Sequence, residues 1–111
     1  MAQAPQAPQK NRRAILEAFV AAHPKDPFAR YGLAMECANS GDLEAAAGHF
    51  QQLLADNPDY IAGYHQYAQL LTRLDRNLEA RQTLTAGIEV ARRVGNDHAR
   101  SEMESLLSLL A

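Results

Sequence analysis

Residues 27–60 read PFARYGLAMECANSGDLEAAAGHFQQLLADNPDY, and residues 61–94 read IAGYHQYAQLLTRLDRNLEARQTLTAGIEVARRV. Small and large side chains recur in and around these two stretches at an interval of 34 residues. The recurring sets are Pro24 and Pro58, Ala34 and Ala68, Ala46 and Ala80, the series Leu16, Phe50 and Leu84, and the series Val20, Leu54 and Ile88. A period of this length is typical of stacked helix–turn–helix units, which present a surface rather than a catalytic centre. The sequence therefore predicts a protein that holds another macromolecule.

The overall composition fits one small globular domain. The chain has 111 residues, and 47% of them are hydrophobic, so a real core is possible. Eleven Lys and Arg side chains oppose thirteen Asp and Glu side chains, which gives a formal net charge of −2. Because there is no basic excess and only 6% of the residues are aromatic, we expect no nucleic-acid partner.

Residue types that carry chemistry are few and scattered. Cys37 is the only cysteine, and no two of the four histidines stand four residues apart, as two metal ligands on one helical face would. We therefore expect no metal, no cofactor and no catalytic residue. No apolar run approaches the roughly 18 residues of a membrane span, and residues 1–9 lack the apolar core of a secretory signal. The sequence thus predicts no membrane contact and a cytoplasmic location.

Six helices and no strands are expected, so the predicted fold class is all-α. The expected helices cover residues 10–22, 27–39, 42–55, 60–74, 78–94 and 96–110. In the first of them, Ile15, Leu16, Phe19 and Val20 form one helical stripe. Every connection is short, which favours antiparallel packing of neighbours. Residues 1–9 are rich in Ala, Gln and Pro and are predicted to be a disordered tail.

Single residues predict where these helices begin and end. Asp26 is a suitable N-cap, and Pro27 suits the first turn that follows it. Gly41 and Gly95 are placed to adopt the left-handed conformation that ends a helix. Asp75 stands where the second unit would have the equivalent glycine, and its short side chain tolerates the same conformation.

These residues resemble the tetratricopeptide repeat family, and in particular its short bacterial-type members with two repeats. The first repeat matches the family pattern at Leu33, Ala34, Ala46, Phe50 and Pro58, and the second at Tyr64, Ala68, Ala80 and Leu84. The resemblance implies a short right-handed α-solenoid of about six antiparallel helices, forming one domain over residues 10–111. Its expected parts are a partial repeat helix (10–24), two repeats (27–60 and 61–94) and a C-terminal capping helix (96–110). Departures from the pattern include Arg30, Cys37, Leu53, Leu71, Asp75 and Gly87.

The resemblance also implies a binding surface, because the first helices of such repeats line a concave groove. The positions that match are Phe28, Tyr31, Met35 and Asn39 in the first repeat and His65, Gln69 and Arg73 in the second, with Gln66 adjacent. Apolar anchors bordered by amides suit a peptide segment of a protein partner. Members that grip a C-terminal carboxylate carry Lys and Asn where this chain has Tyr31 and Met35, so that type of ligand is not expected.

Two alternatives stay open from the sequence alone. The first is a structural homo-oligomerisation module that uses the C-terminal helix and leaves the groove empty. Leu109 lies off the apolar stripe of that helix and could meet another copy, which would make the protein a monomer or a weak homodimer. The second is an enzyme, but Cys37 is expected to be buried as a small hydrophobic side chain.

Overall fold

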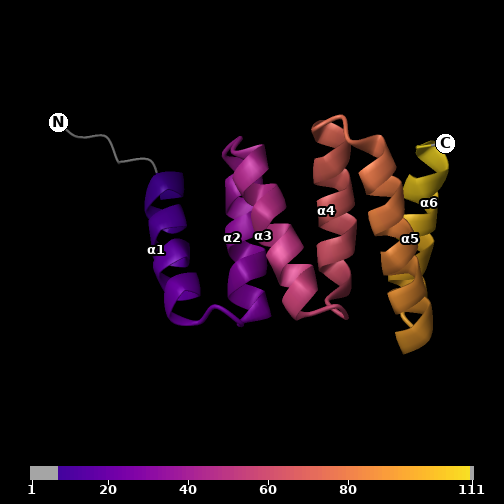
Figure 1. Ribbon diagram of the computed structural model, residues 1–111, viewed down its shortest axis with the longest axis horizontal. Coiled ribbons are helices and arrows are strands. Elements are labelled where there is room, and N and C mark those ends of the chain that lie inside the picture. Colours follow the sequence, from indigo (N-terminus) through magenta and orange to yellow (C-terminus); the bar gives the residue numbers. More distant parts are fainter. Residues whose placement is uncertain (1–7, 111) are drawn as a thin grey trace. The chain divides into compact units, whose positions relative to one another are not determined.

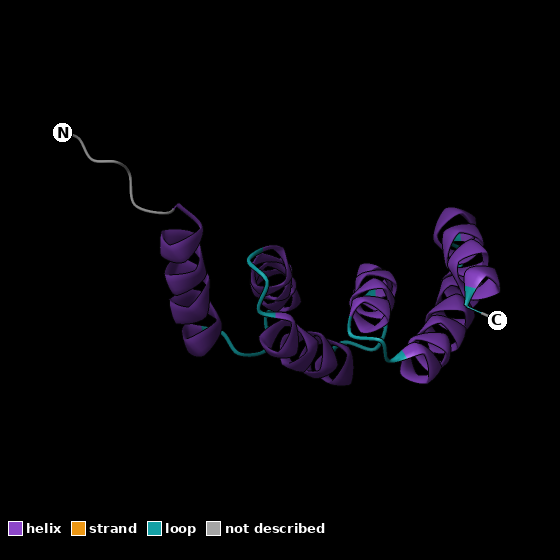
Figure 2. Cartoon of the chain, turned by 90° about the horizontal axis from the view of Figure 1, so that it is seen from above, coloured by secondary structure: helices purple, strands orange, loops and turns teal. Residues whose placement is uncertain are grey.

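A computed structural model describes the backbone of residues 8–110 and the side chains of residues 11–110. The described chain is built from six helices, as the sequence predicted, and it contains no strand in this range. The helices are α1 (Pro8–Ala22), α2 (Pro27–Asn39), α3 (Leu43–Asp56), α4 (Ile61–Arg73), α5 (Asn77–Val94) and α6 (Asp97–Leu109). Figure 1 shows them in order along the chain, and Figure 2 shows the short loops that join them.

The chain divides into two compact units after Asp56, and the single domain expected over residues 10–111 stays a prediction. Helices α1 to α3 belong to the first unit, and α4 to α6 belong to the second. Within each unit, successive helices run antiparallel (Figure 1).

Local signals fix the helix ends. The Asp26 side chain accepts hydrogen bonds from the backbone N–H groups of Phe28 (3.0 Å) and Ala29 (3.2 Å), so it caps α2 as expected. The three expected left-handed residues have that conformation, with φ of 90° at Gly41, 60° at Asp75 and 78° at Gly95. Asp75 therefore adopts the left-handed conformation that a glycine would have at this turn.

The start of α1 differs from the expectation. The helix begins at Pro8, two residues before the predicted start, because proline is tolerated in a first turn whose N–H groups have no intrahelical partner. The rest of the predicted tail, residues 1–7, lies outside the described residues.

Alanines lie at the centre of both helical hairpins. Ala34 of α2 and Ala46 of α3 are fully buried, and so are Ala68 of α4 and Ala80 of α5. Two helices approach closely only where the facing side chains are small, and larger side chains then fill the remaining space. The largest fully buried side chains are Leu33, Cys37, Phe50, Leu53, Leu71, Leu84 and Met103.

The packing around Gly87 explains why this position departs from the repeat pattern. A Cβ atom at this position would lie 2.6 Å from Cβ of Tyr64 in α4 and 2.7 Å from Sδ of Met103 in α6. The glycine therefore allows α5 to be covered by two helices at once. Met103 is itself fully buried, so α6 contributes a side chain to the core of the second unit.

The stripe predicted for α1 does not act as one buried face. Val20 is buried and Leu16 is half-buried, but Ile15 and Phe19 are 69% and 45% exposed. In the first unit α1 packs on α2, so only part of the apolar circumference of α1 is covered.

Candidate partner-binding surfaces

The first candidate surface is an apolar groove between α1 and α2 in the first unit. It encloses about 510 Å³ and is lined by Ile15, Leu16, Phe19, Phe28, Ala29, Tyr31, Gly32 and Met35. Phe28 is 77% exposed although its ring is wholly apolar, and Tyr31 and Met35 are half-buried. An exposed aromatic ring beside a preformed apolar hollow is a suitable anchor point for a partner side chain.

Three of the four residues predicted in the first repeat line this groove. Phe28, Tyr31 and Met35 come from one face of α2, and the Tyr31 ring also meets Phe50 edge-on, with centroids 6.3 Å apart. Asn39 is exposed at the end of α2 and is not among the lining residues.

Sequence reasoning missed the contribution of α1. Ile15, Leu16 and Phe19 form the second wall of the groove, and the Phe19 ring stacks on His23 with centroids 4.4 Å apart. The signal was present as the helical stripe of α1. Its exposure could not be read from the sequence, because a stripe does not say how many neighbours cover it.

The second candidate surface is the polar face of α4 in the second unit. Gln69 is exposed, and its amide nitrogen lies 3.2 Å from Nε2 of His65. Because an amide nitrogen can only donate, Nε2 of His65 accepts this bond, and Nδ1 of His65 lies 3.9 Å from Oε1 of Glu102, beyond hydrogen-bond distance. Gln66 is half-buried and Arg73 is exposed. This face thus offers amide and basic groups.

The last helix reaches this second surface. Glu102 of α6 approaches His65 as described and also lies 3.3 Å from Nε2 of His98. The sequence left open whether the last helix covers the predicted surface. In the structure α6 contacts α4, while Gln69 and Arg73 remain exposed.

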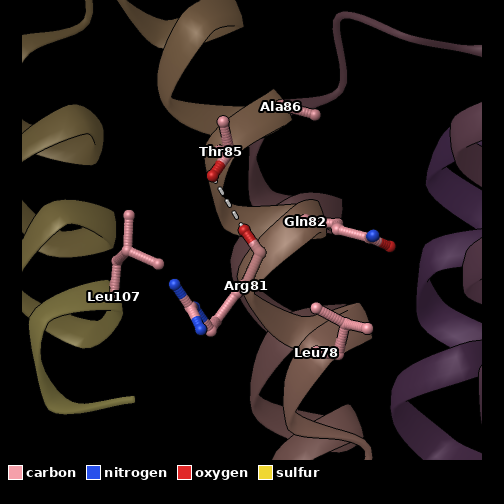
Figure 3. A pocket seen from close by; sticks show the side chains of 6 residues that line it. All are labelled: Leu78, Arg81, Gln82, Thr85, Ala86 and Leu107. Carbon is pink, nitrogen blue, oxygen red and sulfur yellow. Dashed lines mark hydrogen bonds between the residues drawn. The ribbon is translucent and has the colours of Figure 1, made fainter. Parts of the chain in front are cut away.

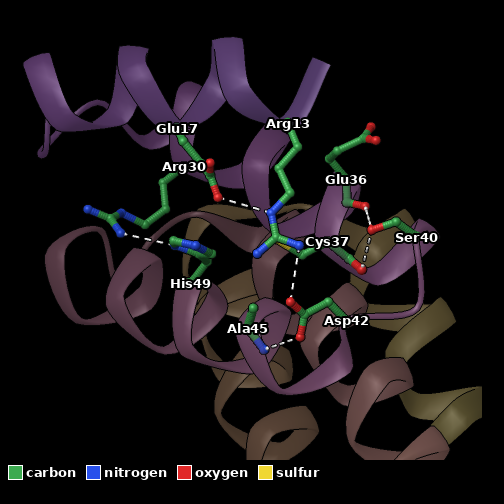
Figure 4. A network of polar contacts seen from close by, with 9 residues as sticks. All are labelled: Arg13, Glu17, Arg30, Glu36, Cys37, Ser40, Asp42, Ala45 and His49. Atoms are coloured by element: carbon green, nitrogen blue, oxygen red, sulfur yellow. Dashed lines mark hydrogen bonds and ion pairs between the residues drawn. The ribbon is translucent and has the colours of Figure 1, made fainter. Parts of the chain in front are cut away.

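A polar network lies on another side of the first unit (Figure 4). Arg13 of α1 donates to Oε2 of Glu17 and to Oδ2 of Asp42, both at 3.0 Å. The bonds from Arg13 and from the backbone N–H of Ala45 hold the pKa of Asp42 below its ordinary value. These bonds tie α1 to the start of α3, and the charges of Arg13, Glu17 and Asp42 pair with one another, which favours a structural role.

His49 belongs to the same network. Its Nδ1 lies 3.2 Å from Nη1 of Arg30, which can only donate, so Nδ1 accepts. Partial burial lowers the pKa of His49, and the charge of Arg30 lowers it further. His49 is therefore a neutral acceptor that orients Arg30.

Cys37 has the environment of a structural side chain. It is fully buried, and burial raises the pKa of its thiol, so little reactive thiolate forms. Among the described residues, no three His, Cys, Asp or Glu side chains lie close enough together to hold a metal ion.

A further open pocket of about 700 Å³ lies at α5 and α6 (Figure 3). Its lining is Leu78, Arg81, Gln82, Thr85, Ala86 and Leu107. The Thr85 hydroxyl donates to the carbonyl oxygen of Arg81 at 2.9 Å, which occupies its proton. Among the described residues that line it, only Arg81 is ionisable, and these residues form no acid–base pair.

Within the part of the chain that the structure describes, no helix combines the length and the apolar character required to span a bilayer.

Comparison with known proteins gives one consistent picture. The family model of the tetratricopeptide repeat matches residues 38–108. A TPR repeat-containing protein of Pseudomonas aeruginosa is 30% identical over 95 residues, which cover 86% of this chain and 90% of that protein. The solution structure of a tetratricopeptide repeat domain protein from Salinibacter ruber is 37% identical and superposes with a TM-score of 0.75, covering 78% of this chain and 88% of that one.

A more distant structure shares the fold. The TPR2B domain of yeast Sti1, solved in a complex with pHsp70, superposes with a TM-score of 0.84 at 17% identity, covering 92% of this chain and 82% of that one.

Proposed function

Because this chain belongs to the tetratricopeptide repeat family, whose fold generally mediates protein–protein interaction, we propose that it is a non-catalytic adaptor that holds a peptide segment of a protein partner. The peptide contacts the α2 face that carries Phe28, Tyr31 and Met35, and the α4 face that carries His65, Gln66, Gln69 and Arg73. Asn39 contributes an exposed amide at the end of α2. That the two faces together line one concave groove stays a prediction.

The observation that carries this proposal is the apolar groove beside α2. A ring as exposed as Phe28 gains hydrophobic free energy when a partner covers it, on the order of 1.5–3 kcal/mol for full burial. The groove is present without a bound peptide, so the protein itself loses little conformational entropy when the peptide binds. The exposed amide of Gln69 and the guanidinium of Arg73 then supply hydrogen bonds to the peptide backbone or to acidic side chains.

The chemistry of the groove also indicates the kind of peptide. Tyr31 and Met35 present an aromatic and a thioether group where a C-terminal carboxylate would need basic and amide groups. We infer an internal segment with apolar anchors rather than a free C-terminus. The similar yeast domain that was solved with pHsp70 supports a protein partner in general terms.

Partner capture tests the proposal. The full chain is used as bait in native cell extract and is compared with the double variant Tyr31→Ala/Gln69→Ala, one change on each face. We expect the double variant to lose most of the partner. The matched control is Leu78→Ala/Gln82→Ala, which removes an apolar group and an amide from exposed positions of α5.

The control should retain the partner, because its residues line the pocket at α5 and α6 and belong to neither face. Equal capture by wild type and Tyr31→Ala/Gln69→Ala would contradict the assignment of the two faces.

One observation favours the runner-up function, homo-oligomerisation through the C-terminal helix. Leu109 is 80% exposed at the end of α6, as its position off the apolar stripe predicted. Its neighbours weaken the case, because Ser101, Glu104, Ser105 and Ser108 are also exposed on this helix and favour contact with water.

A further inference from the structure

The exposed side of α1 has the composition of an interior face. Ile15, Ala18, Phe19 and Ala22 stand at i, i+3, i+4 and i+7, so they lie on one side of the helix, and all four are exposed. We call this set the α1 stripe. Taking roughly 200 Å² as the full area of each large side chain, Ile15, Phe19 and the adjacent Phe28 leave about 380 Å² of apolar surface uncovered.

The repeat itself indicates what kind of element covers such a face. Phe19 is equivalent to Leu53 and Gly87, at intervals of 34 residues, and both of these are buried. At Gly87 the cover is Tyr64 of α4 and Met103 of α6, and both side chains belong to helices. An α-helix is therefore the element that fits over Phe19.

A helix that covers Phe19 cannot cross α1 at the position where the helices of the other two hairpins cross. Arg12 stands at the position of Ala46 and Ala80, the two small residues that let the other hairpins close. The small residues that α1 does expose are Ala18 and Ala22, beside Ile15 and Phe19. A helix that crosses near Ala18 must offer its own small residues between its own large apolar ones.

The α1 helix meets that requirement, and we propose that the α1 stripe docks on the α1 stripe of a second copy of this chain. The two α1 helices pack antiparallel and cross near Ala18, so that Ile15 and Phe19 of each copy lie over Ala18 and Ala22 of the other. The contact is isologous and closed, as in most homodimers.

Charge complementarity favours the antiparallel arrangement. Arg12 is 58% exposed and donates to Oε1 of Glu36 through only one of its nitrogens, so other N–H groups remain available. Its place near the positive end of α1 is unfavourable for the dipole of its own helix. In the antiparallel pair, Arg12 lies about six residues from the crossing, beside the negative carboxyl end of the other α1.

That carboxyl end can accept hydrogen bonds. Pro24 has no N–H group to give to the carbonyl oxygen of Val20, four residues earlier, which is the bond that would continue the helix. The guanidinium of the second copy's Arg12 is a suitable donor to this turn. The dimer therefore joins an apolar centre to a charged contact at each end.

Two copies together bury at most about 760 Å² from these three side chains, which is below the area of a standard interface even after neighbouring alanines are added. We therefore expect a weak, reversible dimer with a Kd on the order of 100 μM. This inference goes beyond the proposed adaptor function and needs no peptide ligand. Because Ile15, Phe19 and Phe28 also line the groove assigned to the peptide, the dimer and the peptide compete for this surface.

Sedimentation of the full chain alone, from about 10 μM to about 1 mM, tests the dimer. The average mass should rise from 12.2 kDa towards twice that value. Ile15→Glu should weaken association at least about tenfold, because it places like charges in the apolar centre of both copies. Leu109→Ser is the matched control, since it removes an equally exposed apolar side chain from α6.

A cross-link fixes the geometry. Ala18→Cys should form a disulfide dimer on mild oxidation, because an antiparallel crossing at this residue brings the two Cα atoms within the roughly 7 Å that a disulfide spans. Ser101→Cys on α6 should not, and the wild type should not, since Cys37 is fully buried. A wild type that stays monomeric at every concentration, an Ile15→Glu variant that associates normally, or a dimer that Leu109→Ser abolishes would each overturn the proposal.

Discussion

Because Gly87 has no side chain, α4 and α6 can pack closely on α5 in the second unit. In an exposed helix position, glycine costs about 0.5–1 kcal/mol relative to alanine. At Gly87 the added methyl group would overlap Tyr64 and Met103, so packing opposes helix propensity. The sequence marked Gly87 only as a departure from the repeat pattern. The reason for it lies in the approach of two other helices, which no local pattern contains.

A pair of glycine substitutions separates packing from propensity. Gly87→Ala should destabilise the protein by about 1–3 kcal/mol through overpacking. Gly48→Ala in α3 should stabilise it by about 0.5–1 kcal/mol, because a Cβ atom there meets no atom within 4 Å and alanine favours the helix. Urea unfolding monitored by circular dichroism measures both. A Gly87→Ala variant as stable as Gly48→Ala would refute the close contact.

At the scale of helices, the sequence predicted where each helix begins and ends better than it predicted which helix faces are buried. The six predicted helices agree with the observed ones to within two residues at each end, because Asp26, Gly41 and Gly95 act on the turn next to them. Burial was harder to predict. Ile15 and Phe19 have the same spacing as a buried pair, yet they are exposed, because among the described residues α1 packs mainly on α2 and no other helix covers them.

The alanine contact is the element-scale feature that closes each hairpin. Ala46→Leu should destabilise the protein by about 1–3 kcal/mol, because α2 and α3 would have to move apart to admit the larger side chain. Thermal unfolding measures the effect. Ala55→Leu, at an exposed position of the same helix, is the control and should leave stability within about 0.5 kcal/mol. Equal melting of the two variants would contradict the packing of the hairpin.

At the scale of the whole molecule, the candidate site was only partly visible in the sequence. The repeat register grouped Phe28, Tyr31 and Met35, and all three line one groove in the structure, since helical periodicity fixes which residues share a face; that a partner binds there stays a prediction. The register did not show that α1 supplies the other wall of the groove, nor that Glu102 of α6 approaches His65. Both depend on neighbours that lie outside the repeat unit.

The adaptor function is tested most directly by asking which surface touches the partner. A photo-reactive phenylalanine analogue is placed at the position of Phe28 in the full chain and, as a control, at the position of Leu78, which is similarly exposed. After irradiation in native extract, the account predicts that a partner protein is cross-linked from position 28 and not from position 78. Cross-linking of that partner from position 78 alone, or equally from both positions, would contradict it.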